Sequence, residues 1–428
     1  MKKIIYVILD GLGDRPHPDL NNQTPLAAAA TPHLDQLAKN GQTGLMYTVG
    51  KGIAPESDIA VISILGYDAE KYYTGRGPLE SYAEGLQVRE GDLAYRVNFA
   101  TLGQGKQIVD RRVGRNLTTQ EATLLAQEIN AKVKLTNIGA DFKFKNTIGH
   151  RGVLVIYPHQ GKLSAEVSNT DPAYEKKGHF GVAKEKFENK VQLCRPVPGK
   201  ENLPEAVNAA RLTNEFVEKS HLVLEQAQVN KERQSQGKLK GNLILTRDAG
   251  DRLPKFPSIK ERFGLDFGCF VEMPVERGIA LLTGMSIVDL ALPTGNADQD
   301  YPLRARKAIA ALQKYDGLYV HLKGPDEPAH DGQALKKKDS IAAIDQYFFG
   351  NLIPNLDLKN FVVCVSADHS TPCVIKAHSD DPVPVLISGG GIEPDQVGTF
   401  SEKSCQQGKL KQLSGPQLMP LLVASAKK

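Results

Sequence analysis

Apolar residues form short continuous runs near both ends of the chain, and each run stops at glycine or acidic residues. The clearest run precedes Asp10, and another precedes Asp368. Runs of this length and composition are typical of parallel strands that are buried on both faces. Because helical patterns separate the runs, we expect an α/β core with a mostly parallel sheet flanked by helices. The expected strands are 4–9, 317–322, 361–366 and 384–388, and the expected helices are 31–40, 304–313 and 340–349.

The middle of the chain has a different pattern. Strand-like segments at 94–102 and 152–157 flank a helix at 118–133, which begins with a Thr118…Glu121 capping box. A long amphipathic helix is expected from Pro204 to about Gln228, and the polar tract 230–240 follows it. A chain of 428 residues exceeds the size at which one core keeps growing. We therefore expect a core domain built from 1–84 and 241–428, with a smaller α/β substrate-binding domain inserted at 85–240.

Composition narrows the classes of partner. Apolar residues make up 41% and charged residues 24% of the chain, which is an ordinary globular balance. The net charge of +4 gives no basis for a nucleic-acid partner, which would need basic residues concentrated on one face. The run Lys336-Lys337-Lys338 is interpreted as a solvated helix face. The expected partner is a small molecule, and no oligomeric state is inferred.

The cysteines and the apolar runs bear on location. Five scattered cysteines without a C-x-x-C pair favour reduced thiols over a disulfide framework or a thiolate zinc site. The apolar run before Asp10 is too short for a secretory signal, and Asp-Gly follows it in place of a cleavage site. No stretch approaches the roughly 20 apolar residues that span a bilayer. We predict a cytoplasmic protein without a membrane partner.

A group of metal-binding residue types follows the predicted strands. Asp326 and His330 are four residues apart, so that one helical turn places them on one face. Asp368 and His369 end the next strand. Oxygen and imidazole donors together suit Mn, Zn or Fe better than Ca or Mg.

Two further residues join this group. Asp10 ends the first strand, and His378 precedes the last one. In an open α/β sheet, ligands gather outside the carboxyl ends of the strands. The three aspartates and three histidines are therefore expected at one place. They suffice for two metals, which at about 3.5–4 Å apart clamp the attacking and leaving oxygens of a phosphoryl transfer.

Ser57 is the candidate nucleophile. It lies in Pro55-Glu56-Ser57-Asp58, just before an apolar helix start. A serine at a helix N-terminus has its hydroxyl near free backbone N–H groups and the positive end of the helix dipole, which suits a phosphate. A helix cap is the competing interpretation of this segment taken alone. Beside a two-metal site the nucleophile is favoured, since metal coordination activates a hydroxyl.

Further motifs extend over nearly the whole chain. They are Asp10-Gly-Leu-Gly-Asp14, Thr24-Pro-Leu-Ala-Ala-Ala29, Thr31-Pro-His-Leu-Asp35, Gly75-Arg-Gly-Pro-Leu-Glu80, Tyr95-Arg-Val-Asn-Phe-Ala-Thr101 and Asp110-Arg-Arg-Val-Gly-Arg115. Together with the serine and metal segments, they give the chain a specific resemblance. It resembles the cofactor-independent phosphoglycerate mutases of the archaeal type, within the alkaline phosphatase superfamily.

The resemblance implies a ligand set and a reaction. Asp326, His330 and His378 would hold one metal, and Asp10, Ser57, Asp368 and His369 the other. Mn is favoured, with Zn, Co or Mg as alternatives, and no bisphosphoglycerate cofactor is expected. Ser57 would take the phosphate from one hydroxyl of a phosphoglycerate and return it to the other, which interconverts 3-phosphoglycerate and 2-phosphoglycerate. The reaction belongs to glycolysis and gluconeogenesis.

Arginines of the insertion are the expected substrate contacts, since arginine forks match carboxylate and phosphate groups. These are Arg96, Arg111, Arg115, Arg151 and Arg247. Asp171 is the candidate base for the glycerate hydroxyls, in a loop where the family places acidic residues. Two positions depart from the family pattern: Asn169 stands for an aspartate, and Asp248 stands for a glycine. The insertion histidines His150, His159, His179 and His221 lack partners at ligand spacing and are not expected to bind metal.

Two other phosphotransfer functions compete on the same metal motifs. A homoserine-kinase-like enzyme would share the core and differ in the insertion, and the arginine cluster Arg111–Arg115 favours the mutase over it. A metal-dependent phosphomonoesterase would pass the phosphate to water, and the large insertion argues moderately against it. A regulatory or scaffold protein without catalysis is disfavoured because Ser57 accompanies the complete ligand set.

Overall fold

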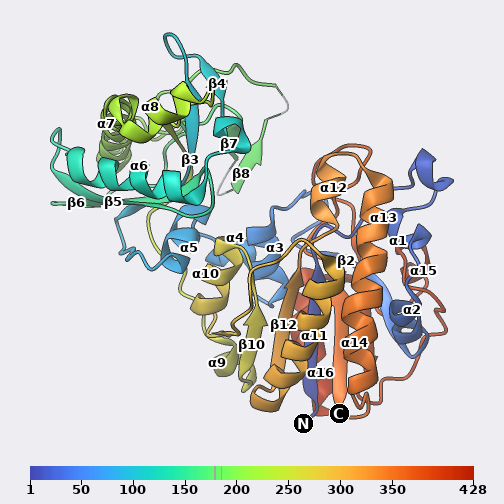
Figure 1. The fold of residues 1–428 in the computed structure, drawn as a ribbon. Helices are drawn as coiled ribbons and strands as arrows, with labels where there is room; N and C mark the ends of the chain where they lie inside the picture. Colours follow the sequence, from blue (N-terminus) through green and yellow to red (C-terminus); the bar gives the residue numbers. More distant parts are fainter. Residues whose placement is uncertain (178–179, 185) are drawn as a thin grey trace. The chain divides into compact units, whose positions relative to one another are not determined.

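The computed structural model describes residues 1–177, 180–184 and 186–428. The chain forms two compact units. Met1–Tyr72 and Lys255–Lys428 form unit 1, and Tyr73–Pro254 forms unit 2 (Figure 1). The predicted insertion 85–240 lies within unit 2, and its role in substrate binding stays a prediction. His179 lies outside the described residues.

Unit 1 contains an eight-stranded sheet in the order β11-β10-β12-β1-β13-β14-β2-β15. Its strands are β1 Lys3–Leu9, β2 Gly41–Tyr47, β10 Phe267–Phe270, β11 Ser286–Ile287, β12 Gly317–Leu322, β13 Phe361–Ser366, β14 Val383–Gly389 and β15 Lys411–Ser414. The helices are α1 Pro25–Ala28, α2 Pro32–Lys39, α3 Ser57–Ile64, α4 Ala69–Tyr72, α9 Ile259–Phe263, α10 Pro274–Leu282, α11 Ala297–Lys314, α12 Asp326–His330, α13 Ala334–Ala343, α14 Gly350–Leu352, α15 Glu402–Cys405 and α16 Gly415–Lys427.

The predicted parallel core is confirmed. β1 pairs in parallel with β12 on one side and with β13 on the other. Every residue of β1 from Ile4 to Leu9 is fully buried, as a central strand covered on both faces must be. Helices α11 and α13 lie across one face in Figure 1, and α16 packs against β1 and β13.

The last predicted strand runs in the opposite direction from the parallel ones. β14 pairs antiparallel with both β13 and β2. The physical reason lies in the connection, because 367–382 contains no crossover helix to carry the chain back for a parallel start. β2 itself was not predicted, since its glycines and polar residues interrupt any alternation of apolar positions.

Unit 2 is built around an antiparallel five-stranded sheet, with order β4-β3-β6-β5 and β9 paired to β3. Its strands are β3 Leu93–Leu102, β4 Ile108–Asp110, β5 Ala140–Asn146, β6 Arg151–Pro158 and β9 Leu243–Gly250, with a separate hairpin of β7 Tyr174–Lys177 and β8 Phe180–Ala183. Its helices are α5 Arg76–Ala83, α6 Thr119–Lys132, α7 Pro204–Gln226 and α8 Gln228–Ser235. The predicted capping box of α6 is present.

The polar tract 230–240 is more ordered than its composition suggests. Its first half belongs to α8, and Arg233 is only 1% exposed. The Arg233 guanidinium donates to Glu121 at 2.8 Å and to the Leu239 carbonyl at 2.8 Å. The side chain of Asn230 bonds Gly241 in both directions and so closes the turn that follows. Within the described ranges, none of the helices combines the length and the apolar character needed to cross a membrane.

Candidate active site

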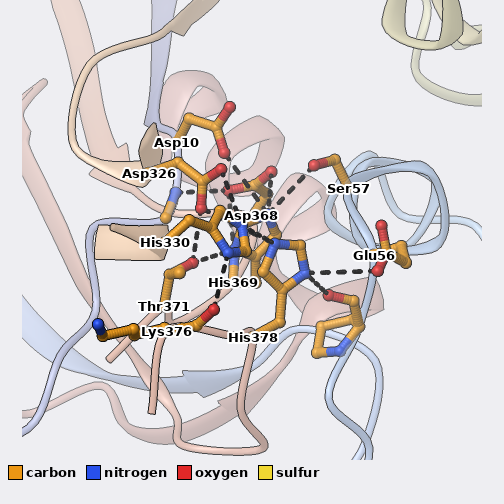
Figure 2. A network of polar contacts seen from close by, with 12 residues as sticks. Asp10, Glu56, Ser57, Asp326, His330, Asp368, His369, Thr371, Lys376 and His378 are labelled. Atoms are coloured by element: carbon orange, nitrogen blue, oxygen red, sulfur yellow. Dashed lines mark hydrogen bonds and ion pairs between the residues drawn. The ribbon is translucent and has the colours of Figure 1, made fainter. Parts of the chain in front are cut away.

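The parallel strands bring the predicted ligands together at one edge of the unit 1 sheet. In the register of the sheet, Ile8 lies beside both His321 and Ser366, so that the ends of β1, β12 and β13 are level. Asp10 follows β1 directly, and Asp368 follows β13 after one residue. Both carboxylates are buried, and they converge with the histidines (Figure 2).

Asp326, His330 and His378 form one group of potential metal ligands, with one donor atom of each residue within 4.8 Å of the others. The short helix α12 places Asp326 and His330 on one face, and the distance from His330 Nε2 to Asp326 Oδ2 is 3.4 Å. His378 comes from the loop before β14, with Nε2 3.8 Å from Asp326 Oδ1. These are the three residues that the resemblance assigns to one metal.

The backbone fixes which nitrogens of this group are free. His330 Nδ1 lies 3.1 Å from the Lys376 carbonyl, and His378 Nδ1 lies 2.8 Å from the Pro55 carbonyl. Since a carbonyl only accepts, both Nδ1 atoms donate, and both Nε2 atoms are directed into the site. These Nε2 atoms are 3.2 Å apart. Two nitrogen lone pairs at that distance repel unless a cation lies between them, so the residues fit a metal.

Asp10, Ser57, Asp368 and His369 form the second group. His369 Nε2 lies 3.5 Å from Asp10 Oδ1, 3.2 Å from Asp368 Oδ2 and 3.1 Å from Ser57 Oγ. His369 Nδ1 lies 3.0 Å from Thr371 Oγ1. Thr371 donates its own proton to Asp326, so it accepts the Nδ1 proton of His369 and directs Nε2 toward the acids.

The electrostatics of this group favour a positive charge at its centre. Burial lowers the pKa of His369, but the charge of Asp368, with Asp326 and Asp10, outweighs it and raises the pKa to about 9. Burial and the neighbouring Asp368 raise the pKa of Asp10 to about 6, against the lowering effect of Lys323. The site therefore holds a proton on His369 strongly and a negative charge on Asp10 reluctantly, whereas the neighbouring histidines outweigh burial and lower the pKa values of Asp326 and Asp368. A divalent cation would supply the positive charge that these carboxylates favour.

Ser57 occupies the position that the sequence predicts, as the first residue of α3. Glu56 precedes it in extended conformation, so the serine side chain lies beside the N–H groups of the first helical turn. The whole helix from Asp58 to Ile64 is buried, which fixes the place of this serine against the sheet.

Sequence reasoning missed three buried or half-buried side chains of unit 1 that contact the predicted ligands or each other. Lys323 donates to Asp10 and, at 2.5 Å, to Glu276 of α10. His321, inside β12, faces Asp10 and Asp368. A lone histidine in an apolar strand carries no spacing signal, and Glu276 is remote in sequence from every motif. Lys323 could have been found, since it follows the strand directly.

Unit 2 contains the predicted arginines. Antiparallel pairing places Arg96 opposite Arg247, and Asn98 opposite Arg151. Burial, followed by the charges of Arg247 and Arg76, lowers the pKa of Arg96 to about 9. This cluster therefore carries more positive charge than its surroundings neutralise, as an anion-binding site does.

Glu80 is the acidic counterpart inside this cluster. It accepts a 2.6 Å bond from Arg76 and lies 3.6 Å from Arg96. The positive charge of the arginines also affects His150. Burial, followed by the charges of Arg151 and other arginines, lowers the pKa of His150 to about 4.

Arg111 and Asp171 form a two-pronged ion pair. Arg111 Nε donates to Asp171 Oδ1 at 2.9 Å, and Nη2 donates to Oδ2 at 2.8 Å. Asp171 is 1% exposed. Arg115, four residues after Arg111, is exposed and has a left-handed backbone conformation with φ of 56°. The structure thus pairs Asp171 with an arginine of its own unit, and its role as a base stays a prediction.

The two positions that depart from the family pattern contact each other. The backbone N–H of Asp248 donates to Asn169 Oδ1 at 3.3 Å. Asp248 has a φ of 56°, in the left-handed region that glycine adopts freely and aspartate tolerates better than most residues. Its carboxylate lies 3.6 Å from Arg247, which also stacks over the Tyr174 ring at 3.8 Å.

Comparison with known proteins gives one consistent family. The model of 2,3-bisphosphoglycerate-independent phosphoglycerate mutase matches residues 38–230. The mutase of that name from Aeropyrum pernix is 43% identical over 418 residues, which cover 96% of this chain and 96% of the relative. The mutase of the same name from Methanoculleus marisnigri is 39% identical, and the match covers 99% of this chain and 97% of the relative. A solved cofactor-independent phosphoglycerate mutase from Thermoplasma acidophilum is 31% identical, with a TM-score of 0.65 and 100% of both chains covered.

Proposed function

The chain belongs to the family of 2,3-bisphosphoglycerate-independent phosphoglycerate mutases, and we propose from this membership and the site that it interconverts 3-phosphoglycerate and 2-phosphoglycerate through a phosphoserine on Ser57. The observation that carries the proposal is the position of Ser57 Oγ, 3.1 Å from His369 Nε2 at the centre of the ligand groups. The family members are isomerases, and the reaction belongs to glycolysis and gluconeogenesis.

Two divalent ions would supply the positive charge that clamps the attacking and leaving oxygens of the transferred phosphoryl group. Asp326, His330 and His378 would hold one of them. Asp10, Ser57, Asp368 and His369 would hold the other. The mixture of oxygen and imidazole donors favours Mn, Zn or Co over Mg, and we propose Mn.

Ser57 carries the phosphoryl group between two hydroxyls of the substrate. In the first half, Ser57 Oγ gives up its proton and forms a bond to phosphorus as the bond from phosphorus to the substrate oxygen breaks, and the departing oxygen takes a proton. The other hydroxyl of the bound glycerate then loses its proton and attacks the same phosphorus, the bond from phosphorus to Ser57 Oγ breaks, and Oγ takes a proton again. Water must be kept out during this interval, because it would release free phosphate.

The arginines of unit 2 are proposed to bind the anionic groups of the substrate. The support is the positive charge around Arg96 and Arg151, because neighbouring arginines contribute to the lowered pKa values of Arg96 and His150. Arg247 lies opposite Arg96 in the sheet. Asp171 is proposed as the base for the glycerate hydroxyls. Both of its oxygens are bonded to Arg111, so this role requires one of them to become free.

We also propose a cytoplasmic location. All five cysteines are free and buried, which suits a reducing compartment.

The decisive experiment is a coupled assay for conversion of 3-phosphoglycerate to 2-phosphoglycerate by dialysed protein, with Mn²⁺ restored and bisphosphoglycerate omitted. We expect turnover that depends on the metal. Ser57→Ala should abolish it while metal content stays close to wild type, and Ser63→Ala, on the same helix, is the matched control. Residual activity above about 1% in Ser57→Ala would contradict the phosphoserine route, since loss of a nucleophile costs several orders of magnitude. Phosphate release or transfer to another alcohol would overturn the substrate.

The arginine assignment has its own test. Replacing both Arg111 and Arg115 with methionine should raise KM by about tenfold or more and leave metal content unchanged, since each lost charged hydrogen bond costs about 1.5–3 kcal/mol. Arg195→Met, at an exposed position of the same unit, is the control. Unchanged kinetics would move substrate binding elsewhere.

A further inference from the structure

Three buried side chains of unit 1 lie close together, and each has one polar atom without a hydrogen bond. Among the described residues, Asp10 Oδ1, Asp368 Oδ2 and His321 Nε2 all lack a hydrogen-bond partner. His321 is 1% exposed and Asp368 is 0% exposed. An unpaired polar atom in the interior is destabilising, so three of them at one place indicate a partner that binds all three.

The spacing of these atoms suits an ion better than direct contact. His321 Nε2 lies 3.6 Å from Asp368 Oδ2 and 3.9 Å from Asp10 Oδ2. Both distances exceed the range of about 2.7–3.2 Å for an N–H···O bond. Donor atoms that each lie about 2.0–2.2 Å from a common ion are separated from one another by roughly 3–3.6 Å. The distance from His321 to Asp368 falls in this range, and the distance from His321 to Asp10 is slightly longer. One donor atom of each of the three residues lies within 4.8 Å of the others.

The other ring nitrogen of His321 is held by groups that orient a ligand. Nδ1 lies 3.3 Å from the Tyr319 hydroxyl and 3.7 Å from Glu276 Oε1. In the tautomer with the proton on Nδ1, which the Glu276 carboxylate favours, Nε2 points its lone pair toward Asp10 and Asp368. A carboxylate behind an imidazole is the usual second contact of a metal-bound histidine. Without a cation, the lone pair would face two acids.

Lys323 does not occupy the same position. Its amine bonds Asp10 through Oδ2, and it bonds Glu276 at 2.5 Å. Asp10 Oδ1 is the oxygen left without a hydrogen bond in the described structure. The lysine therefore bonds Oδ2, the Asp10 oxygen nearer to His321, and leaves Oδ1 available to an ion.

We propose that His321, together with Asp10 and Asp368, coordinates one divalent cation. His321 is thus a metal ligand in addition to the seven residues proposed above. Two carboxylates and one imidazole suit Mn, Zn or Co. The inference rests on the proposed metal site through Asp10 and Asp368, and it requires nothing of the phosphoglycerate chemistry.

The test measures metal binding by the full chain in the absence of substrate. Protein stripped by a chelator is dialysed against a series of Co²⁺ concentrations, and bound cobalt is counted by elemental analysis and followed by its visible absorption. His321→Gln keeps most of the side-chain volume. We expect it to weaken one cobalt equivalent at least tenfold and to change the absorption of that ion. His378→Ala should weaken the binding of a different cobalt equivalent, and the double variant should weaken the binding of both. His221→Gln, in unit 2, is the matched control.

Cobalt binding by His321→Gln that matches wild type in number, affinity and absorption would overturn the proposal. If this variant does not fold without metal, Glu276→Gln replaces it, with an expected fall of about 10- to 100-fold in the affinity for the same ion, and unchanged binding there would overturn the proposal as well. A wild-type protein that binds its ions but lacks mutase turnover would contradict the proposed function and leave the role of His321 intact.

Discussion

At the scale of single residues, Lys337 shows how a surface pattern can conceal a core charge. It lies in a run of three lysines that was interpreted as a solvated face, yet it is fully buried. Its amine donates to Asp14 Oδ2 at 2.8 Å, to the Gly13 carbonyl at 3.1 Å and to the Thr371 carbonyl at 3.0 Å. The interpretation is therefore wrong for this residue. The lysine connects the loop after β1 to the loop after β13, and both loops carry proposed metal ligands.

Loss of this lysine should destabilise the protein strongly. Lys337→Met leaves Asp14 buried without its counter-charge, which costs about 3–5 kcal/mol in the free energy of unfolding. Lys336→Met, at the exposed neighbour, should change it by less than about 0.5 kcal/mol. Urea unfolding of the metal-free proteins measures both. Equal effects of the two substitutions would show that the Lys337–Asp14 pair is not formed.

Glu402 makes stability depend on pH. Burial raises the pKa of Glu402 from 4.5 to about 7, against the lowering effect of its bond from Thr24. The folded state therefore binds this proton more tightly than the unfolded state, and the free energy of unfolding falls as pH rises from about 4.5 to 7. Glu402→Gln removes the dependence. We expect the variant to gain about 1–3 kcal/mol relative to wild type between pH 5 and pH 8, measured by urea unfolding. A pH-independent difference would contradict the assignment.

At the scale of elements, α6 depends on its capping box. Thr118 Oγ1 accepts from the Glu121 backbone at 3.2 Å, and the Glu121 carboxylate accepts from the Thr118 backbone at 2.8 Å. Thr118→Ala should lower the free energy of unfolding by about 1 kcal/mol. Thr123→Ala, at a half-buried position inside the same helix, is the control. A cost as small as that of Thr123→Ala would mean that Arg233, which also bonds Glu121, holds the helix start by itself.

Some elements could be predicted from the sequence and others could not. The buried strands β1, β12 and β13 are uniform apolar runs, so their positions and the Asp10, Asp326 and Asp368 clusters at their ends were readable. The position of β2 could not be predicted, because its glycines interrupt the apolar pattern. Gly41 and Gly44 are needed where close backbone neighbours leave no room for a side chain. These contacts are tertiary and leave no local pattern.

The missed part of the candidate site has the same cause. Glu276 reaches His321 through the packing of α10, a relation between residues 45 positions apart that no spacing rule encodes. The polar tract became half helical for a related reason, since Asn230 and Arg233 find buried partners that composition cannot reveal.

At the scale of the whole molecule, unit 2 is one continuous stretch with its own core. A cluster of buried residues around Tyr95, Phe99 and Phe216 extends over its sheet and helices. We expect the fragment 73–254 to fold when expressed alone, with a single cooperative thermal transition and a far-ultraviolet spectrum of mixed helix and strand. The same fragment with Phe99→Asp is the control and should not fold. A wild-type fragment without a cooperative transition would show that unit 2 needs the rest of the chain.

The parallel pairing of β1 has a consequence for biosynthesis. β1 is synthesised long before its partners, which begin only at Gly317 and Phe361. For most of that time Ile4–Leu9 is an unpaired apolar segment, whereas unit 2 can be completed as soon as Pro254 has emerged. Nascent chains should therefore acquire protease resistance first in unit 2. A ribosome-associated chaperone that covers the unpaired β1 would protect this protein from aggregation during its synthesis.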